Sequence, residues 1–218
     1  MSLDAKSLVS GVNEVFTLPS IYYQIDEAIH DPLSTASRIG HIISDDTGLA
    51  ACLLRMVNSA YFGLPSKIDT ISRAVTVIGT RQLRDLALAT SVIDLFEGIP
   101  DELVNMELFW KHSVACGVAA RVLATYCHET NVERYFVGGM LHDIGSLVIY
   151  SKIPTKAKEV LLSCQEKEHL LYETEESMLG FNHAEVGGLL LEAWDLPSRL
   201  VNMVGRSRYA ENKHPPSL

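Results

Sequence analysis

The sequence lacks a long apolar segment, a secretion leader and paired cysteines. Its apolar runs are interrupted by charge or glycine before they reach the roughly 18 residues that a membrane-spanning helix needs. No N-terminal stretch combines a basic start, an apolar run and a small-residue cleavage site. The four cysteines are scattered without a Cys-x-x-Cys pair, which is typical of reduced, buried thiols. These absences predict a cytoplasmic protein without membrane contact.

Basic residues are fewer than acidic ones: the chain has 18 Lys and Arg and 27 Asp and Glu, which gives a net charge of −9. A domain that binds nucleic acid through its phosphates normally has a basic surface, so the charge does not favour a nucleic-acid partner. Residues 70–88 read as helix, glycine turn, helix, and this pattern resembles a helix-turn-helix with Arg73, Arg81 and Arg84 near its second helix. That second helix is largely apolar, which suits a core better than a DNA groove.

Strand-like alternation is missing as well, whereas apolar residues recur at helical spacing along nearly the whole chain. The pattern predicts long helices over about 106–126 and 132–150, and a boundary at 97–100, where Glu-Gly-Ile-Pro interrupts the helices. The predicted fold is all-α, with two packed helical lobes in one domain of residues 1–218. The lobes span residues 1–100 and 101–208, and residues 209–218 form a loose tail.

The second lobe holds the candidate chemistry in three histidines and an aspartate. His142 and Asp143 are adjacent within the predicted helix 132–150, beside Gly138, Gly139 and Gly145. Each glycine in a helix interior costs roughly 1 kcal/mol relative to Ala, so we expect another backbone or a ligand to approach closely there.

His112 lies in an apolar stripe of the preceding helix, with Cys116 on the same face, and His183 follows Asn182 at a predicted helix start. Imidazole and carboxylate groups from three helices could converge on a divalent cation. The alternative is that each histidine is a core residue with a satisfied hydrogen bond.

The arrangement of His112, His142-Asp143 and His183 resembles the HD superfamily of metal-dependent phosphohydrolases, and the whole chain resembles its HDOD branch. The resemblance covers roughly residues 12 to 204. In the first lobe it rests on Leu18-Pro19, on Ile43 to Asp46, on Leu53 to Arg55, on Val57 to Phe62, on Ile71 to Val75, and on Ile78-Gly79 and Leu83-Arg84. In the second lobe it rests on Phe109-Trp110, His112-Ser113, Gly138 to Gly145, His183 to Gly187, Trp194 and Leu196-Pro197. The resemblance implies an HD-like helical bundle for the second lobe.

The chain departs from the hydrolases at two places. HD hydrolases close their metal site with a further aspartate from a later helix, and the related phosphodiesterases add a His-His pair and a Gly-Tyr-Pro signature. Residues 198–207 supply neither an aspartate nor a histidine pair, and residues 144–147 read Ile-Gly-Ser-Leu. HDOD domains are regarded as signalling modules without an established catalytic activity.

The resemblance therefore implies a regulatory signal-transduction domain that requires no cofactor, has no catalytic activity, and binds a small nucleotide ligand or a signalling protein. The alternative is a metal-dependent phosphohydrolase acting on a nucleotide or cyclic dinucleotide. In that case His112, His142, Asp143 and His183 are the candidate ligands of a divalent metal ion, and Asp143 is the candidate catalytic residue.

Two further sites receive structural interpretations. Asn58 and Ser59 end an apolar helix before Tyr61 and Phe62, and the four residues are predicted to stop the helix and fill the seam between lobes. A ligand groove there is the alternative. The acidic cluster of residues 173–176, with Glu173, Glu175 and Glu176, is predicted to be a solvated face, and the alternative is that it meets a basic partner.

Overall fold

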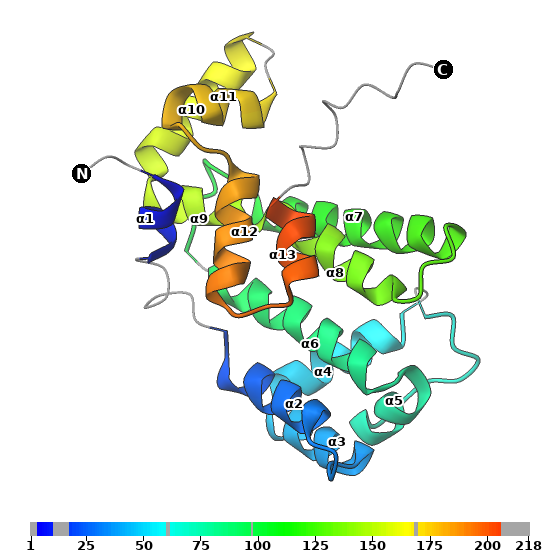
Figure 1. The fold of residues 1–218 in the computed structure, drawn as a ribbon. Helices are drawn as coiled ribbons and strands as arrows, with labels where there is room; N and C mark the ends of the chain where they lie inside the picture. Colours follow the sequence, from blue (N-terminus) through cyan, green and yellow to red (C-terminus); the bar gives the residue numbers. More distant parts are fainter. Residues whose placement is uncertain (1–3, 11–17, 60–61, 97, 168–169, 206–218) are drawn as a thin grey trace, which may run out of the picture. The chain divides into compact units, whose positions relative to one another are not determined.

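The structure, a computed structural model, describes residues 4–10, 18–59, 62–96, 98–167 and 170–205. Within these ranges every regular element is a helix, which confirms the all-α prediction (Figure 1). No helix of these ranges is long and apolar enough to cross a membrane. Contacts between residues group the chain into two units, residues 18–95 and residues 1–17 with 96–218.

The unit of residues 18–95 is built from helices that follow one another closely in the chain. They are α2 (Ser20–His30), α3 (Ala36–Asp45), α4 (Thr47–Val57), α5 (Ile71–Ile78) and α6 (Thr80–Ile93). Short polar side chains start three of them, because the side chains of Thr35, Asp46 and Thr70 accept hydrogen bonds from the backbone N–H three residues later. Gly79, at a φ of 91° that favours glycine, separates α5 from α6.

Asn58 ends α4, as predicted, and also holds the loop that follows. Its side-chain amide donates to the carbonyl oxygens of Leu54 and Ile68 at 2.9 and 2.7 Å, and its carbonyl oxygen accepts from the N–H of Ile68 at 2.7 Å. Ser59 bonds the carbonyl of Met56. Tyr61 lies outside the described residues, and the placement of this segment at a seam between lobes stays a prediction.

The helix pair α5–α6 is part of the core of its unit. Leu83, Leu86 and Leu88 of α6 are at most 3% exposed. Arg84 is engaged inside the unit, with its guanidinium 3.0 Å from Asp26 and 2.8 Å from Asp85. The apolar second helix therefore fills the core, which is the interpretation that the sequence favoured over a DNA-reading helix.

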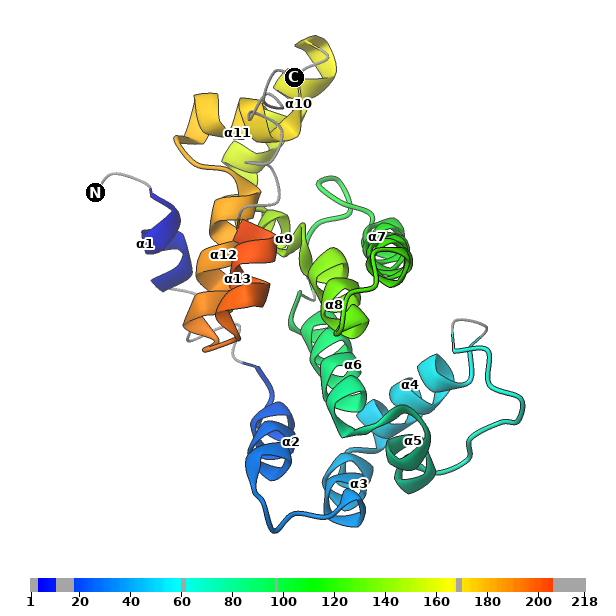
Figure 2. The ribbon, with the colours of Figure 1, turned by 45° about the vertical axis from the view of Figure 1, so that its right-hand side comes forward.

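The other unit consists of a short first helix and the C-terminal helices. They are α1 (Ala5–Ser10), α7 (Met106–Tyr126), α8 (Val132–Leu141), α9 (Ile144–Lys152), α10 (Pro154–Lys167), α11 (Leu171–Leu179), α12 (His183–Ala193) and α13 (Ser198–Gly205). A 3-10 turn over Asp94–Phe96 precedes the later helices. Within this unit α7 packs on α8, and α12 packs on both α9 and α13 (Figure 2).

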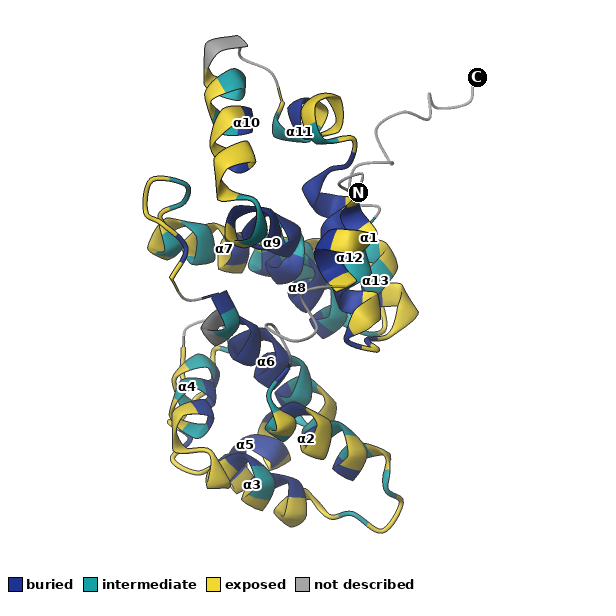
Figure 3. Ribbon diagram, turned by 90° about the vertical axis from the view of Figure 1, so that its left-hand side faces the viewer, coloured by how far each residue is buried: buried dark blue, intermediate teal, exposed yellow. Residues whose placement is uncertain are grey.

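The first helix differs from its predicted place. The sequence put it in the lobe of residues 1–100, whereas α1 contacts α12 and α9 of the C-terminal unit. Its apolar side chains account for this, since Ala5, Leu8 and Val9 are each at most 6% exposed. Both α9 and α12 are buried over most of their length (Figure 3). The two helices also contact each other, and α12 begins at His183.

Candidate functional site

Three helices of the C-terminal unit carry the four predicted site residues. His112 lies in the second turn of α7, His142 and Asp143 lie between α8 and α9, and His183 is the first residue of α12. The side chain of Asn182 caps α12 by accepting from the N–H of Glu185 at 3.0 Å, as its position in the sequence indicated.

The junction between α8 and α9 corrects the sequence analysis, which predicted one helix over residues 132–150. Helix α8 ends at Leu141 and α9 begins at Ile144. The Nδ1 atom of His142 donates to the carbonyl oxygen of Gly139 at 2.7 Å, an acceptor that a continuous helix would use for the N–H of Asp143. Adjacent side chains in a continuous helix diverge by about 100°. The break lets His142 and Asp143 face each other instead.

Two of the three glycines beside this junction, Gly139 and Gly145, lie where backbones meet, as the sequence predicted, whereas Gly138 faces the Met203 side chain. A Cβ atom on Gly139 would be 2.7 Å from the carbonyl oxygen of Cys116 on α7. A Cβ atom on Gly145 would overlap the carbonyl oxygen of His183 and lie 2.6 Å from the backbone nitrogen of Gly187. The missing side chains let α7 approach α8 and let α12 approach α9. This close packing brings residues from distant parts of the sequence together.

Asp143 lies between three imidazole rings. Its Oδ2 atom is 2.9 Å from Nε2 of His142 and 3.8 Å from Nε2 of His112. Its Oδ1 atom is 3.5 Å from Nε2 of His183. The rings of His112 and His142 lie 5.4 Å apart between centroids. All four predicted residues are therefore in one cluster, which we call the His–Asp cluster.

Burial differs sharply across the His–Asp cluster. The side chain of His183 is 1% exposed and that of Asp143 is 21% exposed, whereas His112 is 58% exposed. The cluster is thus buried at its α12 side and open to solvent at its α7 side. A ligand of the cluster would enter past His112.

Glu175, in the middle of α11, contacts the His–Asp cluster, and its predicted place on a solvated face is wrong. It is 1% exposed, and its Oε2 atom accepts from Nδ1 of His183 at 2.5 Å and from the backbone N–H of His183 at 2.9 Å. Glu173 and Glu176 are exposed, as predicted. Residues 175 and 183 lie in different helices and are brought together by the turn after α11, where Gly180 has a φ of 85°. Helical spacing therefore could not predict this contact.

The distances from Asp143 to the three imidazoles are compatible with a shared divalent cation. With Nδ1 of His183 committed to Glu175, its Nε2 atom is buried and makes no hydrogen bond to any described residue. Ligand atoms that each lie about 2.1 Å from a shared ion are roughly 3.0–3.4 Å from one another, close to the spacings around Asp143. A histidine whose second nitrogen is held by a carboxylate is also the usual form of a metal-bound imidazole. The four residues remain candidate ligands on this basis.

Cys116 adds a second, overlapping donor set. Ligand atoms of His112, Cys116 and His142 all lie within 4.8 Å of one another, and the sulfur is 3.5 Å from Nε2 of His112. Burial and the nearby charge of Asp143 raise the pKa of the Cys116 thiol. The i, i+4 spacing of residues 112 and 116 was the available sequence signal for this contact.

Known proteins resemble this chain over most of its length. The family model of the HDOD domain matches residues 15–209. A structure from Shewanella amazonensis named "Putative phosphohydrolase" is 26% identical, with a TM-score of 0.80 over 95% of this chain and 73% of that one. An HDOD domain protein of unknown function from Geobacter sulfurreducens is 25% identical, with a TM-score of 0.81 over 98% of this chain and 70% of that one.

A sequence relative is also found in Treponema pallidum. This uncharacterized protein is 29% identical over 204 residues, which are 92% of this chain and 39% of the relative. The chain therefore spans about two fifths of the length of that relative.

Proposed function

The chain belongs to the HDOD family, and on that premise we propose that it is a regulatory signal-transduction domain that acts by binding rather than by catalysis. The observation that supports this function is the way the His–Asp cluster joins three helices. Asp143 faces imidazole rings from α7, from the α8–α9 junction and from α12. A ligand or proton that changes these contacts would change how the three helices pack, and such a difference in contacts is what lets a ligand shift a conformational equilibrium.

The proposed ligand is a small nucleotide or a partner signalling protein, and the proposed place of action is the cytoplasm. Nucleic acid is not favoured as a partner, because the net charge is −9 and the helix that resembled a DNA-reading helix fills a core. The helices of the C-terminal unit would pass the change on through their packed faces.

The second candidate function is metal-dependent phosphohydrolysis, and the orphaned Nε2 atom of His183 favours it. His112, His142, Asp143 and His183 would hold the cation, and Glu175 would fix the ring of His183. A bound divalent cation supplies a water molecule that is acidified enough to attack a phosphate ester. Helix α13 contributes neither a histidine nor an aspartate to close the site, because residues 198–205 contain none. For this reason we place regulation first.

Metal content and turnover decide between the two functions. The metal stoichiometry of the full chain is measured, together with its turnover of phosphate monoesters and cyclic dinucleotides, for the wild type, His142→Ala and Asp143→Ala. His41→Ala is the matched control, because His41 is exposed on α3 in the other unit. The regulatory function predicts no turnover and a loss of stability of roughly 1–3 kcal/mol in both cluster variants, since each leaves a polar partner unsatisfied.

Stoichiometric metal with turnover that disappears in both cluster variants, but not in His41→Ala, would overturn the regulatory function and establish the hydrolase. Metal without turnover would leave regulation in place and give the cation a structural part in the cluster. The stability measurement is made without added metal, so that loss of a cation is not mistaken for loss of the His–Asp contacts.

A further inference from the structure

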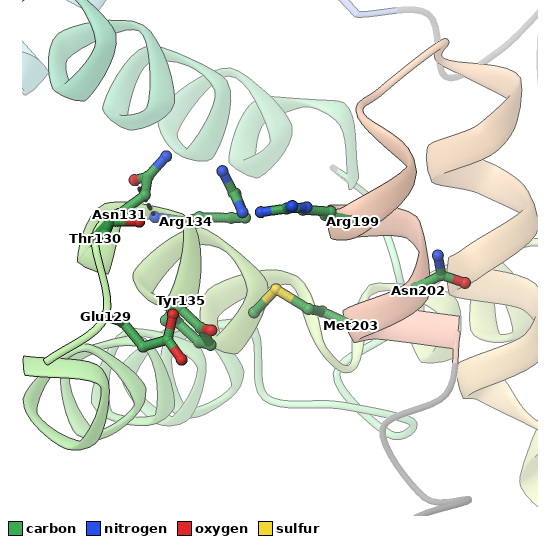
Figure 4. A pocket seen from close by; sticks show the side chains of 8 residues that line it. All are labelled: Glu129, Thr130, Asn131, Arg134, Tyr135, Arg199, Asn202 and Met203. Carbon is green, nitrogen blue, oxygen red and sulfur yellow. Dashed lines mark hydrogen bonds between the residues drawn. The ribbon is translucent and has the colours of Figure 1, made fainter. Parts of the chain in front are cut away.

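A cavity of about 350 Å³ lies in the C-terminal unit and shares no residue with the His–Asp cluster (Figure 4). It is bordered by the turn before α8, the first turns of α8 and the helix α13. Its lining residues are Glu129, Thr130, Asn131, Arg134, Tyr135, Arg199, Asn202 and Met203. This volume falls in the range of about 300–1,000 Å³ that is typical of small-molecule sites.

Two arginines give this cavity its charge. Arg134 comes from α8 and Arg199 from α13, and their side chains extend toward each other across the cavity (Figure 4). Among the described residues, no carboxylate forms an ion pair with either guanidinium within 4.0 Å, although the chain has a net charge of −9. Two like charges held together without a counterion repel each other, and a bound anion would offset that repulsion.

The lining also has one acidic residue, Glu129. The Glu129 carboxylate beside the Tyr135 hydroxyl raises the pKa of Tyr135. The Tyr135 side chain lies beside Glu129 at one side of the cavity, and the Met203 side chain extends toward it (Figure 4). The cavity therefore has a cationic part and an apolar part that includes an aromatic ring.

We infer that this cavity binds a small phosphate monoester that carries a planar ring, which is the chemical class of a nucleoside monophosphate. The planar forks of Arg134 and Arg199 match the oxygens of a phosphate group in paired hydrogen bonds. The ring of Tyr135 and the side chain of Met203 offer a surface on which a planar ring can stack. The size of this cavity favours a small molecule over a phosphorylated peptide, which needs an extended groove.

The position of the cavity suits an effector site. Helix α8 begins at the cavity with Val132 and ends at Leu141, directly before His142 of the His–Asp cluster. A ligand that draws Arg134 toward Arg199 acts on the first turn of the same helix. This inference does not depend on the proposed function, because it would hold for a regulatory domain and for a hydrolase alike.

Calorimetric titration of the full chain with adenosine 5′-monophosphate tests the inference. Saturable binding is expected at millimolar ligand or below, and Arg134→Gln and Arg199→Gln are each expected to weaken it at least tenfold. Arg81→Gln is the matched control, because it removes the same charge from an exposed position on α6 and is expected to leave the affinity unchanged. Arg134→Lys keeps the charge but loses the fork, so an intermediate affinity is expected.

The two parts of the ligand are tested separately with inorganic phosphate and adenosine, each of which is expected to bind at least tenfold more weakly than the monophosphate. Equal affinity for inorganic phosphate would overturn the ring-binding part, and binding unaffected by both arginine variants would overturn the site. A phosphoserine peptide that binds more tightly than the nucleotide would overturn the choice of a small molecule. Arg199 is exposed, so Arg199→Gln keeps the test valid if Arg134→Gln folds poorly.

Discussion

The His–Asp cluster and the arginine cavity lie at opposite ends of α8 and differ in whether their charged groups have partners within the chain. In the cluster the charged groups face partners from the chain itself, with Asp143 between three imidazoles and Glu175 on His183. In the cavity the two guanidinium groups have no ion pair with any described carboxylate. A site whose charges are neutralised internally contributes to the stability of the fold. A site whose charges are left unpaired depends on something from outside.

The two units differ in how far apart in the sequence their contacting polar residues lie. In residues 18–95 most of the polar contacts join residues that are close in the sequence, such as Asn58 with Ile68, and the pair of Arg84 with Asp26 is an exception. In the C-terminal unit the cluster joins residues 112, 142–143 and 183, which only the tertiary fold brings together. Variants that separate folding from ligand binding test this difference.

The largest effect is expected from Gly139→Leu. Its side chain would have to enter the contact in which a Cβ atom already lies 2.7 Å from a backbone oxygen of α7. Backbone atoms cannot move aside as a flexible side chain can, so a loss of more than about 3 kcal/mol in the free energy of unfolding is expected. Gly48→Leu is the control, because a Cβ there meets only a side-chain oxygen of Asp46 at 3.4 Å. Equal melting temperatures of the two variants would refute the close contact of α7 with α8.

Glu175→Ala is expected to lower the free energy of unfolding by about 3 kcal/mol, because it leaves two buried donors of His183 without an acceptor. Glu173→Ala is the matched control, since Glu173 is an exposed residue of the same helix. Chemical denaturation of both variants measures the difference. If both cost less than about 0.5 kcal/mol, the original view of residues 173–176 as one solvated face would be restored.

Asn58→Ala is expected to cost about 2 kcal/mol, because the N–H and the carbonyl oxygen of the buried Ile68 lose their partner. Asn58→Asp keeps an acceptor for that N–H, so a smaller loss is expected. Faster hydrogen exchange of the Ile68 amide in the Ala variant than in the Asp variant would identify the bond as the cause. An unchanged exchange rate in both would contradict this role.

The smallest effect on stability is expected from Arg134→Gln, within about 0.5 kcal/mol, because its guanidinium has no described ion-pair partner to lose. Arg84→Gln makes the same chemical change at an arginine that contacts both Asp26 and Asp85, and a larger loss is expected. Thermal unfolding of the two variants compares a paired with an unpaired arginine. A larger loss from Arg134→Gln than from Arg84→Gln would mean that the cavity arginine serves the fold.

Features that depend on neighbours in the sequence were predictable. Helical spacing indicated the all-α fold, Asn182 and Asn58 marked helix ends, and the glycines around residue 142 indicated close backbone contacts. Each of these follows from a residue and those within one or two helical turns of it. The order of motifs along the chain also indicated the family.

The tertiary structure decided what depends on distant partners. Whether Glu175 faces solvent or a buried histidine is set by the turn between α11 and α12. The helix break before Asp143 follows from a side-chain bond of His142 that competes with the helix, which apolar spacing does not reveal. The arginine cavity needs α8 and α13 to meet across more than 60 residues of chain, and no local pattern encodes that approach. Composition and periodicity determine which elements form, whereas packing determines which polar groups they bring together.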